Sequence, residues 1–162
     1  MSLDVKQLRG ALGRFATGIT VVTCRDATGQ RVGLTVNSFN ALSLDPPLIL
    51  WSLRNASPSV AAFEQARHFA VNVLCQAQMP VSQSFASAVP DRFGVGDWAE
   101  GEGGVPVLRD ALACFECALE RVQPMGDHRL FIGRVLAARQ AEGEPLIYHA
   151  GCYRAQIGRA HV

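Results

Sequence analysis

Apolar and polar positions follow a helical period in three short stretches of the chain and a strand-like pattern in most of the remainder. An i, i+3, i+4, i+7 repeat of apolar residues over 8–15 predicts an amphipathic helix, which Asp4 caps and Gly18 ends. A Ser-Pro pair opens a second predicted helix over 57–66, and a third, short one is predicted over 79–87.

The predicted strands are runs rich in Val, Ile, Leu and Phe: 19–24, 32–36, 48–53, 69–74, 114–122, 129–138 and 145–150. Residues 25–31, with Gly29, form a hairpin turn, and the glycine-rich stretch 90–106 is predicted to be a loop. Strands outnumber helices and several connections are short. We therefore expect a fold that is mainly β with peripheral helices, an antiparallel sheet or barrel. No G-x-G-x-x-G follows a strand, so a nucleotide would not bind in a Rossmann cleft.

The length of 162 residues suits a single domain over 1–162, and the formal net charge is only +1. The charges are mixed in sign and form no basic stripe, so neither nucleic acid nor an anionic membrane surface is an expected partner. Charged residues within 1–18 argue against a signal peptide. The uncharged stretch 69–90 carries too many amides and hydroxyls to span a bilayer, so we expect a soluble protein.

Five cysteines without an export signal predict reduced thiols and a cytoplasmic location. Cys114 and Cys117 match C-x-x-C, but on a strand positions i and i+3 point to opposite faces. Two buried thiols are therefore favoured over a redox or metal site, and no metal is expected.

A polar cluster interrupts the apolar pattern in "GLTVNSFNALSLDPPLILWSL" (33–53). Thr35, Asn37 and Ser38 lie where a strand leaves the sheet, and an unpaired buried polar group costs about 1–3 kcal/mol. These groups could bond a planar heterocycle, together with backbone N–H groups freed at the strand end. The alternative is a turn in which Asn and Ser bond their own backbone, and the spacing alone favours the turn.

Arg54, Ser57 and Ser59 surround the start of the second predicted helix. Hydroxyls, a guanidinium and free backbone N–H groups suit a phosphate, although an ordinary serine cap beside a solvated arginine gives the same pattern.

The segment "GDHRLFIG" (126–133) places Asp127 and His128 at the mouth of a strand, after a turn that Gly126 permits. A neighbouring carboxylate can fix the tautomer and orientation of a histidine. As the base of a nucleophile His128 lacks a partner, since no G-x-S-x-G occurs, and a plain Gly-Asp turn remains the alternative.

The segments "GLTVNSFNALSLDPPLILWSL", "GDHRLFIGRV" and "PLIYHAGCYRA", in this order and spacing, resemble the short-chain flavin reductase family. Its members are the NAD(P)H-dependent reductase components of two-component flavin monooxygenases. The resemblance extends from about Leu8 to Ala155 and implies an FMN-binding split β-barrel of the flavin-reductase type. Such proteins are usually homodimeric, with the flavin bound at the barrel's edge.

The resemblance also implies three groups of site residues. The flavin ring would lie along Thr35, Val36, Asn37, Ser38 and Phe39, and its ribityl phosphate would meet Ser52, Arg54, Ser57 and Ser59. The nicotinamide would be received at Gly126, Asp127 and His128, with His128 as the candidate catalytic residue. Arg92, Phe93, Tyr148 and Tyr153 are weaker correspondences, as consistent with packing as with contact. The expected flavin is FMN, with FAD as the alternative, and the nicotinamide is NADH or NADPH.

The implied reaction passes a hydride from the nicotinamide to flavin N5, which requires no protein nucleophile. The function expected from the resemblance is that of an NAD(P)H-dependent flavin oxidoreductase supplying reduced flavin to a partner monooxygenase. The alternative is a flavin-binding electron-transfer or storage protein without nicotinamide turnover. A purely structural domain remains only if no flavin binds.

Overall fold

The computed structural model of the protein describes residues 2–154. Met1 and residues 155–162, which the single-domain prediction includes, lie outside the described residues. The described helices are α1 (Val5–Leu12), α2 (Val60–Gln65) and α3 (Met79–Phe85), with 3-10 turns η1 (Gln76–Gln78), η2 (Arg92–Gly94) and η3 (Glu102–Gly104). The described strands are β1 (Thr17–Gly18), β2 (Thr20–Arg25), β3 (Arg31–Val36), β4 (Asn40–Leu44), β5 (Pro47–Arg54), β6 (His68–Val73), β7 (Trp98–Glu100), β8 (Pro106–Leu108), β9 (Ala113–Met125), β10 (His128–Gln140), β11 (Ile147–His149) and β12 (Cys152–Arg154).

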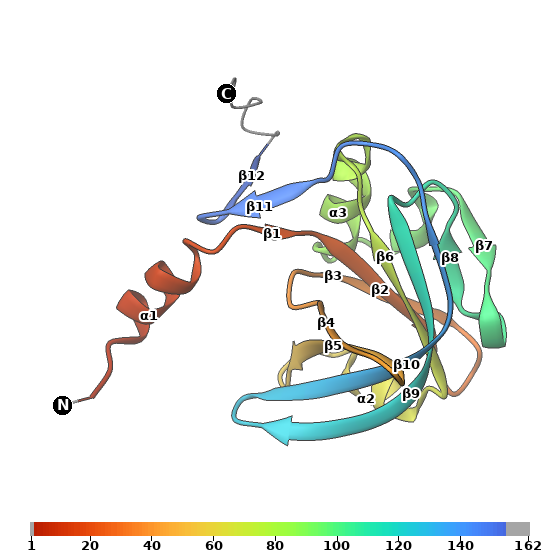
Figure 1. Ribbon diagram of the computed structural model, residues 1–162, viewed down its shortest axis with the longest axis horizontal. Helices are drawn as coiled ribbons and strands as arrows, with labels where there is room; N and C mark the ends of the chain where they lie inside the picture. Colours follow the sequence, from red (N-terminus) through yellow and green to blue (C-terminus); the bar gives the residue numbers. More distant parts are fainter. Residues whose placement is uncertain (1, 155–162) are drawn as a thin grey trace.

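Seven strands form one curved sheet in the order β3-β2-β6-β9-β10-β5-β4, in which neighbours pair antiparallel (Figure 1). The two edge strands, β3 and β4, are consecutive in the chain and are joined by residues 37–39. That connection therefore runs from one edge of the sheet to the other. The expected fold class, mainly β with peripheral helices in a split barrel, is confirmed.

Two small sheets complete the fold, and one of them corrects the sequence prediction. Strands β1, β11 and β12 form the first, and β7 pairs with β8 in the second. The prediction that 90–106 is entirely loop was wrong, because Trp98 pairs with Leu108 and packs with Phe85 and Phe93. Glycines on both sides of this three-residue strand made the whole stretch look like a loop in the sequence. The edge strand β4 was also missed, because its mostly exposed residues lack an apolar alternation.

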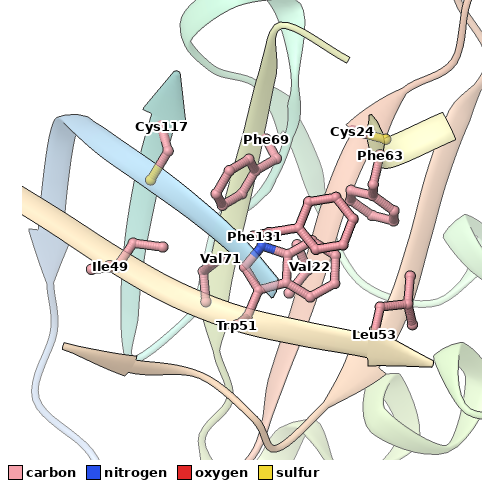
Figure 2. Packing of buried hydrophobic residues seen from close by; sticks show 10 residues of the cluster. All are labelled: Val22, Cys24, Ile49, Trp51, Leu53, Phe63, Phe69, Val71, Cys117 and Phe131. Carbon is pink, nitrogen blue, oxygen red and sulfur yellow. The ribbon is translucent and has the colours of Figure 1, made fainter. Parts of the chain in front are cut away.

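An aromatic cluster fills the concave side of the sheet (Figure 2). Trp51 of β5 stacks on Phe131 of β10, with ring centroids 4.4 Å apart and an interplanar angle of 12°. Phe63 of α2 meets Trp51 edge-on at 4.9 Å, which ties that helix to β5. Fully buried aromatic side chains contribute most to core energetics, so this cluster fixes β5, β10 and α2 relative to one another.

The prediction that Cys114 and Cys117 point to opposite faces of their strand is confirmed on β9. Cys117 lies in the aromatic cluster with Phe115 and Leu119 packed against it, whereas Cys114 belongs to a separate buried cluster. Burial raises the pKa of the Cys117 thiol to about 12 and that of Cys114 to about 11. Both are free thiols held in the protonated form, as expected for buried cysteines.

Two helix boundaries differ from the predictions. Asp4 caps α1 as expected, accepting the backbone N–H of Lys6 at 2.9 Å, but the helix ends at Leu12 rather than near Gly18. Glycine at position 13 is a poor helix former and serves as the C-cap, its N–H bonding the carbonyl of Arg9. The second helix begins at Val60, after a turn over 57–59. Within residues 2–154, each helix is too short or too polar to cross a membrane.

Candidate functional site

A groove of about 550 Å³ lies between the end of the edge strand β3 and the end of β5. Its walls come from the end of β3, the connection to β4, the end of β5, the loop before α2, the end of α3 and the first residue of β10. Nine of the predicted site residues line it: Thr35, Val36, Asn37, Ser38, Ser52, Arg54, Ser57, Ser59 and His128. The split of the barrel therefore brings together segments separated by more than seventy residues in the chain.

The hydroxyls of the polar cluster are satisfied within the protein. Thr35 donates its hydroxyl to the carbonyl of Ser82 at 2.7 Å, which ties the end of β3 to α3. Ser38 donates to the carbonyl of Ser52 at 2.8 Å and accepts the backbone N–H of the same residue at 3.0 Å. In this way a side chain continues the pairing of β5 beyond Asn40, the first residue of β4. Both partners are distant in the sequence, so these two hydroxyls are satisfied by tertiary contacts and not by a turn that bonds its own backbone.

The remaining residues of this segment divide between the groove and the core. Asn37 is exposed and lines the groove, and Val36 lies between the groove and the packed interior. Phe39 does not line the groove. Its ring packs against Phe115, with centroids 5.3 Å apart, on the aromatic cluster. The segment therefore offers the groove backbone atoms and one amide side chain.

The second wall carries a cation and hydroxyls. Arg54 is exposed, and its guanidinium takes part in none of the ion pairs between residues 2 and 154. The Ser57 hydroxyl accepts the backbone N–H of Ser59 at 3.3 Å, as a cap would, although the regular helix starts later. Ser59 caps α2 without a side-chain hydrogen bond. A guanidinium and serine hydroxyls at one end of the groove suit an anion such as a phosphate.

The turn before β10 holds a histidine at the mouth of the groove. Gly126 adopts a φ of 58°, a left-handed conformation that favours glycine. Asp127 contacts His128 through Oδ1 and Nδ1 at 2.7 Å, and this hydrogen bond holds the pKa of the Asp127 carboxyl below its usual value. An ionised carboxylate only accepts, so Nδ1 of His128 carries the proton and Nε2 remains free. Of this turn only His128 lines the groove.

A polar network joins this turn to the loop that carries the serines. The backbone N–H of Asn55 donates to the carbonyl of Asp127 at 2.9 Å. The Asn55 side-chain oxygen accepts from Arg129 at 2.7 Å, and Arg129 also pairs with Glu64 of α2 at 2.7 Å. The turn, the loop and the helix are thus linked in one chain of contacts. No sequence pattern indicates this network, because the three side chains become neighbours only through the β5–β10 pairing.

Arg92, a weaker correspondence in the sequence, lines the groove together with Phe85 and Ala86 at the end of α3. Its guanidinium donates to the carbonyl of Gly33 at 2.7 Å and to that of Ser87 at 2.8 Å, so it also holds α3 against β3. Phe93 packs with Phe85 and Trp98 instead of lining the groove.

Tyr148 and Tyr153 line a smaller cavity of about 220 Å³, which shares Thr35, Val36 and Asn37 with the groove. Tyr153 bonds Ser82 through the two hydroxyls at 2.8 Å. Among residues 2–154 no three His, Cys, Asp or Glu side chains come together as a metal site would require.

Comparison with known proteins identifies the family of the chain. The model of the flavin reductase like domain matches residues 12–156. The chain belongs to this family. A curated relative, the "Probable flavin reductase" of Rhizobium meliloti (strain 1021), is 45% identical over 150 residues, which are 93% of this chain and 48% of the relative. The chain thus spans about half the length of that flavin reductase.

Two further relatives match over more of their own length. The reductase subunit HsaB of a flavin-dependent monooxygenase from Rhodococcus jostii (strain RHA1) is 40% identical, over 94% of this chain and 78% of its own. The NADH:FAD oxidoreductase SgcE6 of Streptomyces globisporus, solved with NAD and FAD fragments, has a TM-score of 0.90 and 34% identity, and covers 99% of both chains.

Proposed function

We propose that the protein is an NAD(P)H-dependent flavin oxidoreductase that passes a hydride from a nicotinamide to a flavin. The observation that carries the proposal is the groove at the sheet split, where Asn37, Arg54 and His128 converge from three separate segments. Membership of the flavin reductase like domain family supports the same conclusion.

The groove fits a flavin mononucleotide unit in volume and in chemistry. About 550 Å³ lies within the range of roughly 300–1,000 Å³ that is typical of small-molecule sites. The backbone of 35–38 and the Asn37 amide would hold the ring edge, and Arg54 with Ser57 and Ser59 would hold the phosphate. Gly126 and Asp127 act from outside the groove by placing His128. Phe39 supports the ring segment from the core.

Bound flavin supplies the hydride acceptor and the reduced nicotinamide supplies the hydride. The residues of this chain bind and orient the two. Asp127 would keep the proton on Nδ1 of His128, and Nε2 of this groove-lining residue would then be able to accept a hydrogen bond from the nicotinamide amide. The aromatic cluster beneath β5 and β10 keeps Ser52 and His128 in register.

We also propose a flavin-dependent monooxygenase as partner, supported by the relative that is a reductase subunit of such an enzyme. One domain over 1–162 is supported by a family model that spans 12–156. A reducing, cytoplasmic location is consistent with five free thiols.

A homodimer belongs to the same proposal. In Figure 1, α1 lies apart from the sheet, and Val5, Leu8 and Leu12 along it are 63%, 41% and 65% exposed. A second copy of the chain would cover this stripe.

The deciding experiment is a flavin titration followed by turnover. Purified protein is titrated with FMN and with FAD by flavin fluorescence, and oxidation of NADH and of NADPH is then followed at saturating flavin. We expect saturable flavin binding and flavin-dependent oxidation of at least one nicotinamide. Tight flavin binding without oxidation of either nicotinamide would identify an electron-transfer or storage protein, and the absence of flavin binding would reject both functions.

A further inference from the structure

A second groove, here called the distal groove, continues from the first at its serine end. It measures about 640 Å³ and lies between the β2–β3 hairpin and the loop that follows α3. Pro58, Ser59 and Arg92 line both grooves, so the two are adjacent at these residues. A ligand whose phosphate lies at Ser57 and Ser59 therefore has room to extend beyond that phosphate.

The distal groove is cationic. Three arginines line it and Asp91 is its single carboxylate, within residues 2–154. Arg25 donates a hydrogen bond to the carbonyl of Gly104 at 2.7 Å and forms an ion pair with Glu100 at 2.8 Å. Arg92 donates hydrogen bonds to the backbone carbonyls of Gly33 and Ser87. Arg31 is exposed and joins none of the ion pairs in this part of the chain.

Arg31 is nevertheless held in place. Its guanidinium carbon lies over the ring of Phe93, 4.7 Å from the centroid, and both residues line the distal groove. Phe93 is in turn fixed edge-on by Phe85 at 4.9 Å and by Trp98 at 4.9 Å. A guanidinium supported by an aromatic face loses little freedom on binding, and its planar group can stack on a nucleobase while its charge attracts a phosphate.

We propose that the distal groove binds the adenylate half of a dinucleotide, with Arg31 stacked on the adenine or paired with the adenylate phosphate. This inference rests on the proposed function, because it places the flavin mononucleotide unit in the first groove. The adenylate can come from FAD, in which case the protein prefers FAD to FMN, or from the nicotinamide dinucleotide. In both cases the recognised chemistry is the same.

The test compares ligands with and without the adenylate. Affinities for FMN, FAD and AMP are measured by calorimetry or fluorescence, and KM is measured for NADH and for reduced nicotinamide mononucleotide at saturating FMN. If FAD supplies the adenylate, FAD binds at least about tenfold more tightly than FMN. If NADH supplies it, KM for NADH lies about tenfold below that for the mononucleotide while FMN and FAD bind alike. The proposal is overturned if FMN and FAD bind with equal affinity and the KM values for NADH and reduced nicotinamide mononucleotide are also equal.

Variants of Arg31 assign the effect. Arg31→Ala is expected to abolish the adenylate advantage and AMP binding while FMN affinity stays unchanged. Arg31→Lys keeps the charge without the planar group, so recovery of the advantage by lysine would identify a phosphate contact and its absence a stacked base. Arg9→Ala, an exposed arginine on α1 outside both grooves, is the matched control. An advantage that survives Arg31→Ala overturns the proposal.

Direct AMP binding separates this inference from the proposed function. If NADH is oxidised with bound flavin, but FMN and FAD bind equally and the KM values for NADH and reduced nicotinamide mononucleotide are equal, the function stands and the adenylate site is rejected. If no flavin binds but AMP binds in an Arg31-dependent manner, the adenylate site stands and the function is rejected.

Discussion

His128 lies directly opposite Arg54 in the antiparallel pair of β10 and β5. Both residues line the groove, and the next pair on the same face, Leu130 and Ser52, places the serine beside them. Opposite partners in a sheet have Cβ atoms about 4.5–5.5 Å apart. The pairing register therefore determines the distance between the proposed nicotinamide contact and the proposed phosphate contact, which are 74 positions apart in the sequence.

Removing the imidazole is expected to separate turnover from flavin binding. In His128→Ala, kcat/KM for the nicotinamide should fall about 100-fold, because a misplaced reactant is costly, while the flavin dissociation constant changes little. Stopped-flow oxidation and flavin titration measure the two quantities. His149→Ala, on β11 outside the groove, is the control. Unchanged turnover in His128→Ala would remove this residue from the site.

Asn55 is expected to act on the same step without touching the ligand. Its side-chain oxygen accepts from Arg129, which links the turn before β10 to α2. Its side-chain amide also donates to the carbonyl of Gly126 at 3.4 Å. Loss of these bonds in Asn55→Ala should raise the KM for the nicotinamide up to about tenfold and leave the KM for flavin within twofold. The control is Asn40→Ala, whose side chain bonds only the adjacent backbone N–H of Ala41. An equal rise in both KM values would indicate general loosening of the fold instead.

The strands of the main sheet other than β4, and most of the groove residues, could be predicted from the sequence, because apolar runs and Gly-Asp or Ser-Pro signals are local. The sequence could not predict which polar groups would lack a hydrogen-bond partner within the protein and so remain available to a ligand. Thr35 and Ser38 look like ligand contacts in the sequence, but their hydroxyls bond Ser82 and Ser52, which only the fold brings close. Arg31 had no distinguishing pattern, since its place over Phe93 depends on how the loop after α3 folds back on β3.

Glycine at position 133 is required by a close approach between strands. An added Cβ there would collide with the Phe69 ring and lie 3.0 Å from the Cβ of Cys117, at a bulge in the β9–β10 pairing. Gly133→Ala should lower the free energy of unfolding by about 1–3 kcal/mol, the usual cost of overpacking. Gly18→Ala in β1, where nothing lies within 4 Å of the added Cβ, should change it by less than about 0.5 kcal/mol. Urea denaturation followed by tryptophan fluorescence compares the two, and equal midpoints would contradict the packing argument.

The stability of the β2–β3 hairpin should depend on pH through the carboxyl of Asp26. The Thr28 hydroxyl, at 2.7 Å, together with backbone N–H groups of the turn, lowers the pKa of this carboxyl. A depressed folded-state pKa gives stability that is present above the ordinary value of about 3.9 and is lost as the pH falls through the folded-state pKa. Asp26→Ala should therefore lower Tm at pH 7 and converge with the parent protein near the acid limit. A Tm difference that is constant from pH 7 down to acid would show that charge plays no part.

The apolar stripe on α1 predicts the assembly state. Val5, Leu8 and Leu12 are spaced on one side of a helix that buries none of its residues in the single chain. A carboxylate in the middle of a covered apolar surface is not tolerated unless it is paired, so Leu8→Asp should convert a dimer to a monomer. Light scattering after size-exclusion chromatography measures the mass. Lys6→Asp, a charge change on the same helix away from the stripe, should leave the dimer intact. A parent protein that is monomeric at micromolar concentration would contradict the dimer, and a Leu8→Asp protein that remains dimeric would place the interface elsewhere.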